Sequence, residues 1–263
     1  MLDPGSARYR DAVAEARGQL AGNGAAELCD FLTPAGVDAL VVDADSLAER
    51  AHRSSGRATA YLDVADAAVA PDHPRRYRGE YAVGAVAYDL IPTSSPLRRL
   101  YEWPPLRQLV AAVLARGSLY PYADPFGALN LAVMGPGDQL QWHFDQTDFV
   151  VSLAVQGAGA GGDFEVAPRI RGPHDERYDA VAAVLAGDRT AVRTVPMTPG
   201  TLLVFEGRHS LHRVSPVGGD RLRHVGLLAY DTQPGTVGTE RLWRNRYGRA
   251  RAHRVPPERW PAA

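Results

Sequence analysis

The sequence predicts a mainly β domain with added helices, of the β-sandwich or jelly-roll type. Three observations predict this fold class. After Ala128 the chain breaks into short β-type runs separated by glycine and proline turns. The first third instead spaces alanine, valine and leucine at helical intervals. The length of 263 residues fits one large domain with a substantial hydrophobic core, which is the expected organisation.

Helices are expected mainly in the first 120 residues, where they would buttress the β-structure. Apolar residues recur at helical spacing over 9–20 and 34–52, and Thr33 is placed to cap the second of these helices. The segment 61–95 holds three prolines and an arginine cluster and is expected to be irregular. A further helix is expected over 96–116.

Strands are expected in the second half of the chain, with one helix at 178–185 between them. Glycines 157, 159 and 162 match the GxGxxG pattern of dinucleotide-binding loops, but that pattern must open a helix, and residues 163–166 look like a strand. We therefore expect a hairpin turn at these glycines. The expected strands are 129–134, 149–156, 164–167, 193–196, 201–205 and 224–230.

The composition argues against several partners and chemistries. The formal charge is −1 and the pI is about 6.7, so no global field draws the chain to nucleic acid or to a membrane surface. No lysine occurs, which excludes Schiff-base chemistry and a Walker-type phosphate loop. The single cysteine, Cys29, and the lack of a signal peptide or a long apolar run predict a cytoplasmic protein. The arginines of 241–259 are expected to form a solvated face or an arginine–carboxylate contact in a homodimer.

A candidate metal site lies in two segments far apart in the sequence. His143 and Asp145 are two residues apart, so on an extended segment both side chains project to one face. His212 follows 69 residues after His143 and can reach them if its strand neighbours theirs. Two imidazoles and one carboxylate on one side of a metal form the arrangement of mononuclear non-haem Fe(II) oxygenases. The nearby His209 is the competing candidate, but it faces the opposite way to His212 on an extended segment.

The residues around these three strengthen the assignment. The stretch 129–235 resembles the Fe(II)/2-oxoglutarate-dependent oxygenases, whose fold is the double-stranded β-helix. A Gly-Pro-Gly-Asp turn at 135–138 precedes the HxD strand, a strand at 199–205 precedes His212, and two arginines follow it, in the order of that family. More narrowly, residues 161–165, the insert 178–188 and residues 210–217 are similar to the subgroup that halogenates or hydroxylates free amino acids.

The resemblance implies a domain organisation and a reaction class. A single domain, 1–263, is expected to hold a helical buttress with substrate loops at 1–120, a jelly-roll or cupin-like β-helix core at 121–235 and a C-terminal lid or tail at 236–263. Halogenases of the subgroup place glycine or alanine where Asp145 stands, which leaves an iron position for chloride. Because Asp145 fills that position, we expect hydroxylation of an amino acid or oxidative ring closure of the cyclopropane or aziridine type, in natural-product biosynthesis.

The resemblance also implies Fe(II), O2 and 2-oxoglutarate, and the distal carboxylate of 2-oxoglutarate needs a buried cationic fork. Arg223, eleven residues after His212, is the first choice, and Arg221 is the alternative on the same strand face. Asn130 on an earlier strand is expected to donate to the cosubstrate or to the substrate, unless it only caps the strand end.

An amino-acid substrate needs a cation for its carboxylate and an acceptor for its ammonium group. Candidates for the first are Arg78, Arg75 and Arg76, and candidates for the second are Asp148 and Asp124. Trp243 or Tyr247 is expected to close over the pocket. Two other protein classes stay open on the same residues. A zinc-dependent hydrolase would use His143, Asp145 and His212 without oxygen, and a non-catalytic cupin-like binding protein would have no need of a cation at Arg223.

Overall fold

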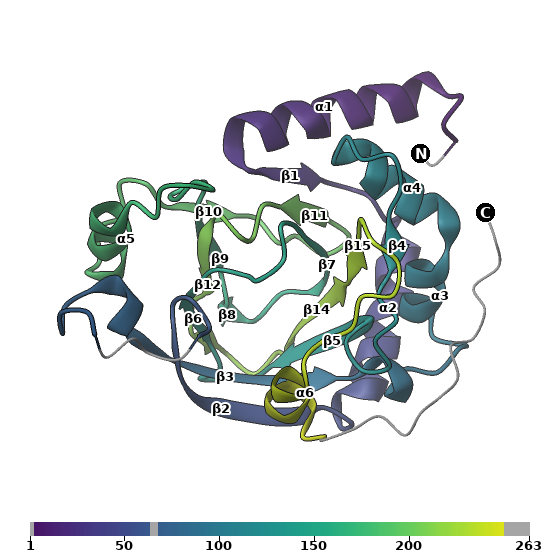
Figure 1. Ribbon diagram of the computed structural model, residues 1–263. Helices are drawn as coiled ribbons and strands as arrows, with labels where there is room; N and C mark the ends of the chain where they lie inside the picture. Colours follow the sequence, from purple (N-terminus) through teal and green to yellow (C-terminus); the bar gives the residue numbers. More distant parts are fainter. Residues whose placement is uncertain (1–2, 64–67, 250–263) are drawn as a thin grey trace.

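Two antiparallel sheets face each other across the core of the protein (Figure 1), in a computed structural model that describes residues 3–63 and 68–249. This arrangement confirms the predicted fold class, a jelly-roll core with helices added. The larger sheet contains, in spatial order, β1 (Ala25–Leu28), β11 (Leu202–Phe205), β7 (Val150–Gln156), β14 (Arg223–Leu228), β5 (Leu129–Met134), β3 (Arg78–Val86) and β2 (His52–Thr59). The smaller sheet contains β10 (Arg193–Val195), β9 (Phe164–Ala167), β12 (Leu211–Val214) and β6 (Leu140–His143). Short pairs join β13 (Val217–Gly218) to β8 (Ala160–Gly161) and β15 (Tyr230–Asp231) to β4 (Tyr120–Pro121).

Four helices cover the outer face of the larger sheet, on its upper and right-hand sides in Figure 1. As expected, the Thr33 hydroxyl accepts a hydrogen bond from the Gly36 amide at the start of the second helix. A fifth helix lies outside the smaller sheet, and a sixth lies beside β2 and β3. The helices are α1 (Ala7–Asn23), α2 (Pro34–Ala48), α3 (Pro96–Glu102), α4 (Pro104–Val113), α5 (Tyr178–Leu185) and α6 (Glu240–Tyr247), with 3₁₀ turns η1 (Pro74–Arg76) and η2 (Tyr88–Leu90). Within the described ranges, no helix is long and apolar enough to cross a lipid bilayer.

Alternation along the strands separates the two hydrophobic layers. On β5, Leu129, Leu131 and Val133 pack with the helices, whereas Ala132 and Met134 belong to the cluster between the two sheets. Successive side chains of a strand point to opposite faces, so Asn130 faces the interior of the barrel together with Ala132 and Met134. This face of β5 is therefore part of the wall around any site between the sheets.

Three expectations about local structure were wrong. The helix expected over 96–116 is two helices, because Pro104 holds the preceding Trp103 in an extended conformation (φ −74°, ψ 117°). The segment 61–95 is not irregular throughout, because β3 runs through its second half and pairs with β5. The glycines of 157–162 do not form a hairpin turn. They connect β7 of the larger sheet to β9 of the smaller one, and β8 within this connection pairs with β13.

Candidate metal centre

The two histidines of the predicted metal site lie side by side on neighbouring strands. β6 and β12 pair in antiparallel fashion, and His143 is directly opposite His212 in their register. Directly paired residues project to the same face of a sheet, so both imidazoles point the same way. The ring centroids are 4.2 Å apart. The sequence-based expectation that the strand of His212 neighbours that of His143 is thereby confirmed.

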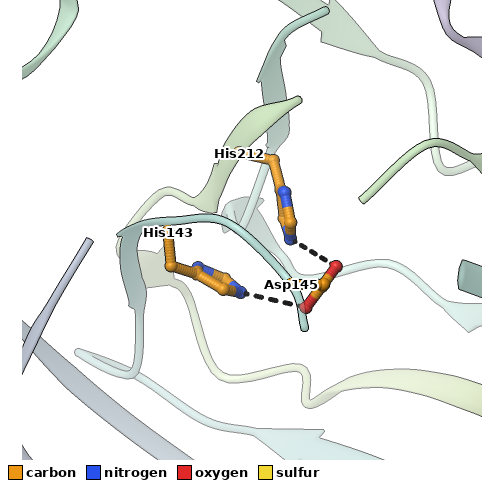
Figure 2. Close-up of side chains that lie close together, drawn as sticks. All are labelled: His143, Asp145 and His212. Atoms are coloured by element: carbon orange, nitrogen blue, oxygen red, sulfur yellow. Dashed lines mark ion pairs between the residues drawn. The ribbon is translucent and has the colours of Figure 1, made fainter. Parts of the chain in front are cut away.

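Asp145 completes the cluster from just beyond the end of β6. Its amide donates to the carbonyl of Gly207, 3.1 Å away, which turns the chain back toward β12. Figure 2 shows both imidazoles pointing at its carboxylate. The Nε2 atom of His143 lies 3.8 Å from Oδ1, and that of His212 lies 3.2 Å from Oδ2. One atom from each side chain lies within 4.8 Å of the other two, a spacing that suits three ligands of one ion.

Backbone carbonyls orient both rings. The Nδ1 atom of His143 lies 2.8 Å from the Gln141 carbonyl oxygen, and that of His212 lies 2.9 Å from the Ser210 carbonyl oxygen. A carbonyl oxygen only accepts, so each Nδ1 carries the proton and donates. The Nε2 atom of each ring then faces Asp145. This is the outer contact that fixes the tautomer of metal-binding histidines.

Burial and neighbouring charges set the ionisation of the cluster. Burial, reinforced by the nearby His212, lowers the pKa of His143 to about 4, so that its imidazole is neutral at pH 7. Burial also lowers the pKa of His212, but the charge and hydrogen bond of Asp145 outweigh it and the pKa is raised overall. For Asp145, the attraction of both histidines outweighs burial, and the carboxyl pKa lies below its usual value. The site therefore presents an anionic carboxylate, as a divalent cation requires.

A glycine allows the carboxylate to reach this position. A Cβ atom added to Gly207 would lie 2.4 Å from Oδ2 of Asp145 and 2.9 Å from its Cβ. No side chain larger than hydrogen fits there without moving Asp145. Gly207 was not singled out from the sequence, because nothing local shows that residues 145 and 207 meet.

Arg223, the first choice for the cosubstrate carboxylate, is buried at the start of β14. Its Nε donates to the carbonyl of Gly162 at 2.8 Å, and its Nη1 lies 3.8 Å from the sulfur of Met134. Among the described residues it forms no ion pair, and burial lowers its pKa to about 10. It lines a cavity of about 160 Å³ together with Phe164, whose ring lies against His212. A buried guanidinium without a carboxylate partner fits an anionic ligand.

The other two cosubstrate candidates, Arg221 and Asn130, lie in different surroundings. Arg221 does not share the face of Arg223, because β14 begins only at Arg223 and the strand alternation does not extend before it. Its exposed side chain instead donates to the carbonyls of Gly157 and Ala158, so the expectation of a shared face is corrected. Asn130 does face the barrel interior and is almost fully buried.

Three of the substrate candidates, Arg78, Trp243 and Asp148, lie in different surroundings. Arg78 is exposed and donates to the carbonyl of Arg57, and it makes no contact with the metal cluster in the part of the chain that the structure describes. The indole Nε1 of Trp243 donates to Asp124 at 2.8 Å, which fastens α6 to the barrel. Asp148 is paired with Arg208 and lines a cavity of about 540 Å³ beside the segment that follows Asp145.

The charge of Arg246, a residue that the sequence did not single out, acts on the cluster. Arg246 on α6 lowers the pKa of both His143 and Asp145, so its charge acts on the cluster directly. The arginine-rich tail was expected to be a solvated face or a dimer contact, and its part beyond residue 249 lies outside the described residues. The helical spacing of Trp243, Arg246 and Tyr247 is the signal that could have identified Arg246, since the three share one face of α6.

The fold and this cluster define a class of protein. Two imidazoles and a carboxylate converge inside a jelly roll. This donor set is the facial arrangement that mononuclear non-haem iron enzymes use. The fit to iron rests on the donor types and on the two Nε2 atoms that face Asp145.

Comparison with solved structures gives the same fold. An oxidoreductase of the 2OG-Fe(II) oxygenase family from Burkholderia pseudomallei superposes with a TM-score of 0.54 at 15% identity, covering 89% of this chain and 94% of that one. AviO1 from Streptomyces viridochromogenes Tue57 gives a TM-score of 0.58 at 20% identity, covering 85% and 96%. The non-heme alpha ketoglutarate dependent epimerase SnoN from nogalamycin biosynthesis gives 0.57 at 15% identity, covering 84% and 81%. A further structure of that epimerase is a complex with Fe3+ and alpha ketoglutarate.

The family follows from the sequence as a whole. The family model for Halogenase D matches residues 9–237, and the chain belongs to this family. No curated protein matches the chain. The expected class, an enzyme related to the Fe(II)/2-oxoglutarate oxygenases, is thereby confirmed. The predicted cofactors, Fe(II) and 2-oxoglutarate, agree with the neighbouring structures and with the His-Asp-His cluster.

Proposed function

We propose that this protein uses Fe(II), 2-oxoglutarate and O2 to oxidise an unactivated C–H bond of a free amino acid or amino-acid derivative. The outcome would be hydroxylation or oxidative ring closure, in natural-product biosynthesis. The family and the fold support the oxygenase class, and two of the structural neighbours carry names from nogalamycin biosynthesis. The amino-acid substrate rests on the similarity of residues 161–165, 178–188 and 210–217 to the amino-acid-oxidising subgroup.

One observation favours an oxygenase over the zinc hydrolase and the cupin-like binding protein. The guanidinium of Arg223 is buried inside the barrel without an ion-pair partner among the described residues. Burying an unpaired charge is costly, and neither alternative has a use for it. A carboxylate of 2-oxoglutarate would form an ion pair with this guanidinium and offset the free-energy cost of burying its charge.

Each residue of the site then has a definite task. His143, Asp145 and His212 would hold Fe(II), and Arg223 would bind the distal carboxylate of 2-oxoglutarate. The bound metal with its cosubstrate and O2 supplies the oxidising power toward a C–H bond. Phe164 and Phe205, whose rings lie against His212, exclude water from one side of the site.

Asp145 supports oxygenation rather than halogenation within the Halogenase D family. Its carboxylate lies where it would occupy one iron position, so that no position on that side is left for a halide. We therefore propose that this member returns oxygen to the substrate or closes a ring.

Among the substrate candidates, Asp148 lies at the cavity of about 540 Å³ and would accept from the substrate ammonium group. The hydrogen bond from Trp243 to Asp124 supports an indirect part for this indole, which would hold α6 over the site rather than contact the substrate. Arg78 is exposed and donates to the carbonyl of Arg57, which supports a contact during substrate entry rather than one beside the metal.

The test is aerobic incubation with Fe(II), 2-oxoglutarate and a panel of free amino acids, including side-chain-nitrated ones, with mass spectrometry of the products. We expect succinate together with a product that gains oxygen or loses two hydrogens. His212→Ala should abolish both, whereas His209→Ala, which removes a nearby imidazole outside the cluster, should leave both unchanged.

The alternatives predict different results. A hydrolase would act without oxygen and without 2-oxoglutarate. A cupin-like binding protein would bind a ligand without turnover, and Arg223→Met would then leave 2-oxoglutarate binding unaffected. Succinate formation that persists in His212→Ala would contradict the assigned metal site.

A further inference from the structure

The C-terminal helix places a second cation inside the barrel. Gly238 and Trp243 both donate to Oδ2 of Asp124, at 2.6 and 2.8 Å, and so fasten α6 to the loop before β5. Tyr247 is buried in a cluster with Phe126 and with Ala85 of β3. Between these two anchors, Arg246 extends its side chain to Asn130 on the inner face of β5.

Arg246 has an incomplete set of partners. Within the described part of the chain, its side chain makes one hydrogen bond, from Nη2 to Oδ1 of Asn130 at 3.5 Å, the limit of such a contact. It forms no ion pair there. The other two cations of α6 have closer partners: Arg244 pairs with Glu240 on the exposed side of the helix, and Arg241 donates to the carbonyl of Leu62 at 2.6 Å. A guanidinium carries five N–H donors, so most donors of Arg246 are available to a ligand.

Asn130 adds a further donor at the same point. Its Oδ1 accepts from Arg246, and its Nδ2 amide donates no hydrogen bond to the described residues. Asn130 is almost fully buried and faces the barrel interior. An amide and a guanidinium side by side, both with unused donors, form a site for a small planar anion.

The donors of Arg246 and Asn130 lie apart from Arg223, the residue proposed to bind the cosubstrate. Arg223 contacts Met134, four residues beyond Asn130 on the same face of β5, a separation of about 13 Å along a strand. Arg223 and Arg246 therefore contact opposite ends of the inner face of β5. The metal cluster borders the same interior, because His212 packs against Phe164 and Phe205, and these rings cluster with Ala132 and Met134 of this face of β5.

We propose that Arg246, assisted by Asn130, binds the carboxylate of the substrate and so sets which carbon lies at the metal. This inference rests on the proposed function and adds to it the residue that recognises the acid group. A single guanidinium fork suits a carboxylate, whereas a phosphate dianion would call for a second cation at the same point. Substrates of this site are then carboxylic acids, with free amino acids as the expected members.

The experiment titrates the anaerobic Fe(II)·2-oxoglutarate complex, followed by its visible charge-transfer absorption. The probes are the twenty L-amino acids, each beside its carboxamide, together with butyrate and hexanoate. Bound probes shift the absorption without turnover. We expect the amino acid that binds the wild type to bind Arg246→Met roughly 10- to 100-fold more weakly. Its carboxamide should bind both proteins equally poorly.

Two variants and one separate titration control the result. Arg244→Met removes a cation of the same helix on its exposed side and should bind like the wild type. Arg246→Lys keeps the charge without the fork and should recover part of the affinity. The affinity for 2-oxoglutarate, read from the absorption itself, should be the same in all four proteins.

Each contrary result has a distinct meaning. Equal carboxylate binding by the wild type and Arg246→Met would overturn the inference. A wild type that binds none of the carboxylates would overturn it too. Both results leave the oxygenase function intact. A loss of 2-oxoglutarate affinity in Arg246→Met would assign Arg246 to the cosubstrate instead. Simple carboxylates that bind through Arg246 while amino acids do not would support the inference and contradict the amino-acid substrate. A wild type that never develops the absorption would remove the proposed function and this inference with it.

Discussion

Gly207 shows how a single residue without a side chain governs the position of a metal ligand. A methyl group here would collide with Asp145, so Gly207→Ala should displace the carboxylate. We expect the affinity for Fe(II) or Co(II) to fall by roughly 10- to 100-fold, the usual effect of disturbing the support of a metal ligand. Anaerobic titration calorimetry measures it.

Gly157→Ala is the matched control, because a Cβ there meets nothing within 4 Å. Its metal affinity should equal that of the wild type. Unchanged affinity in Gly207→Ala would mean that Asp145 relocates freely and that its position does not depend on this close approach.

A second residue-scale prediction concerns Glu165 on the outer side of the smaller sheet. Arg189 donates to both of its oxygens, at 2.9 and 2.5 Å, and Arg213 donates at 2.5 Å. Burial raises the pKa of Glu165, but these two guanidinium groups outweigh it and lower the pKa below the usual 4.5. A lowered folded-state pKa stabilises the protein above pH 4.5, and this contribution is lost as the pH falls below 4.5.

Glu165→Gln should therefore cost about 1 kcal/mol at pH 7, since both arginines are partly exposed and solvent screens the pairs. Urea unfolding of the variant and the wild type at pH 7 and near pH 4 measures the difference in stability. The difference should shrink at the lower pH. A difference that stays constant with pH would show that Glu165 acts through packing rather than charge.

At the scale of elements, one buried carboxylate holds α6 in place. Asp124 accepts from the amides of Phe126 and Gly127 through Oδ1 and from Gly238 and Trp243 through Oδ2. Asp124→Asn replaces one carboxylate oxygen by an amide NH2 group. This new donor then faces the N–H groups that donate to Asp124 in the wild type. We expect a loss of about 2 kcal/mol and faster hydrogen exchange in α6, measured by mass spectrometry.

Glu240→Gln provides the comparison for this helix, because its pair with Arg244 is exposed and contributes little. Since α6 carries Arg246, Asp124→Asn should also weaken carboxylate binding. Normal exchange in α6 of Asp124→Asn would mean that packing of Tyr247 alone fixes the helix.

At the scale of the whole molecule, the metal site joins segments from distant parts of the chain. Binding an ion to the folded state alone should stabilise it by about 2.7 kcal/mol at a free concentration 100 times the dissociation constant. For a chain of this size this corresponds to a rise in Tm of roughly 5–10 °C. Thermal unfolding with Co(II) and with a chelator measures it. His212→Ala should show no rise, and a full rise in that variant would place the ion elsewhere.

The organisation of the whole chain is confirmed only at the level of its fold. The N-terminal third contributes β1, β2 and β3 to the larger sheet in addition to its helices, so the barrel and its buttress share one sheet. The single-domain organisation and a homodimer contact through the arginine-rich tail stay predictions. Sedimentation of the intact chain tests the second.

Strands whose own residues alternate or are uniformly apolar were predictable, and strands that depend on a neighbour were not. β5 and β9 were expected with their observed bounds, because each is fully buried and apolar or nearly so. β2 is mostly exposed and reads His-Arg-Ser-Ser-Gly-Arg-Ala-Thr, which carries no period of two. It is a strand because it pairs along its whole length with β3, and such pairing is not visible in the local sequence.

The sequence by itself determined the candidate residues of the site: two histidines and a carboxylate that can form a facial set, and an arginine eleven residues after the second histidine. The first three could be identified because their types and spacing suit a metal, and the arginine because of the resemblance to the Fe(II)/2-oxoglutarate oxygenases. The tertiary structure alone decided which further groups surround them. Gly207 beside Asp145, and Arg246 beside Asn130, meet across more than 60 and 100 residues of chain. Contacts at such separations depend on how sheets and helices pack, and packing follows from the whole set of buried side chains rather than from any local pattern.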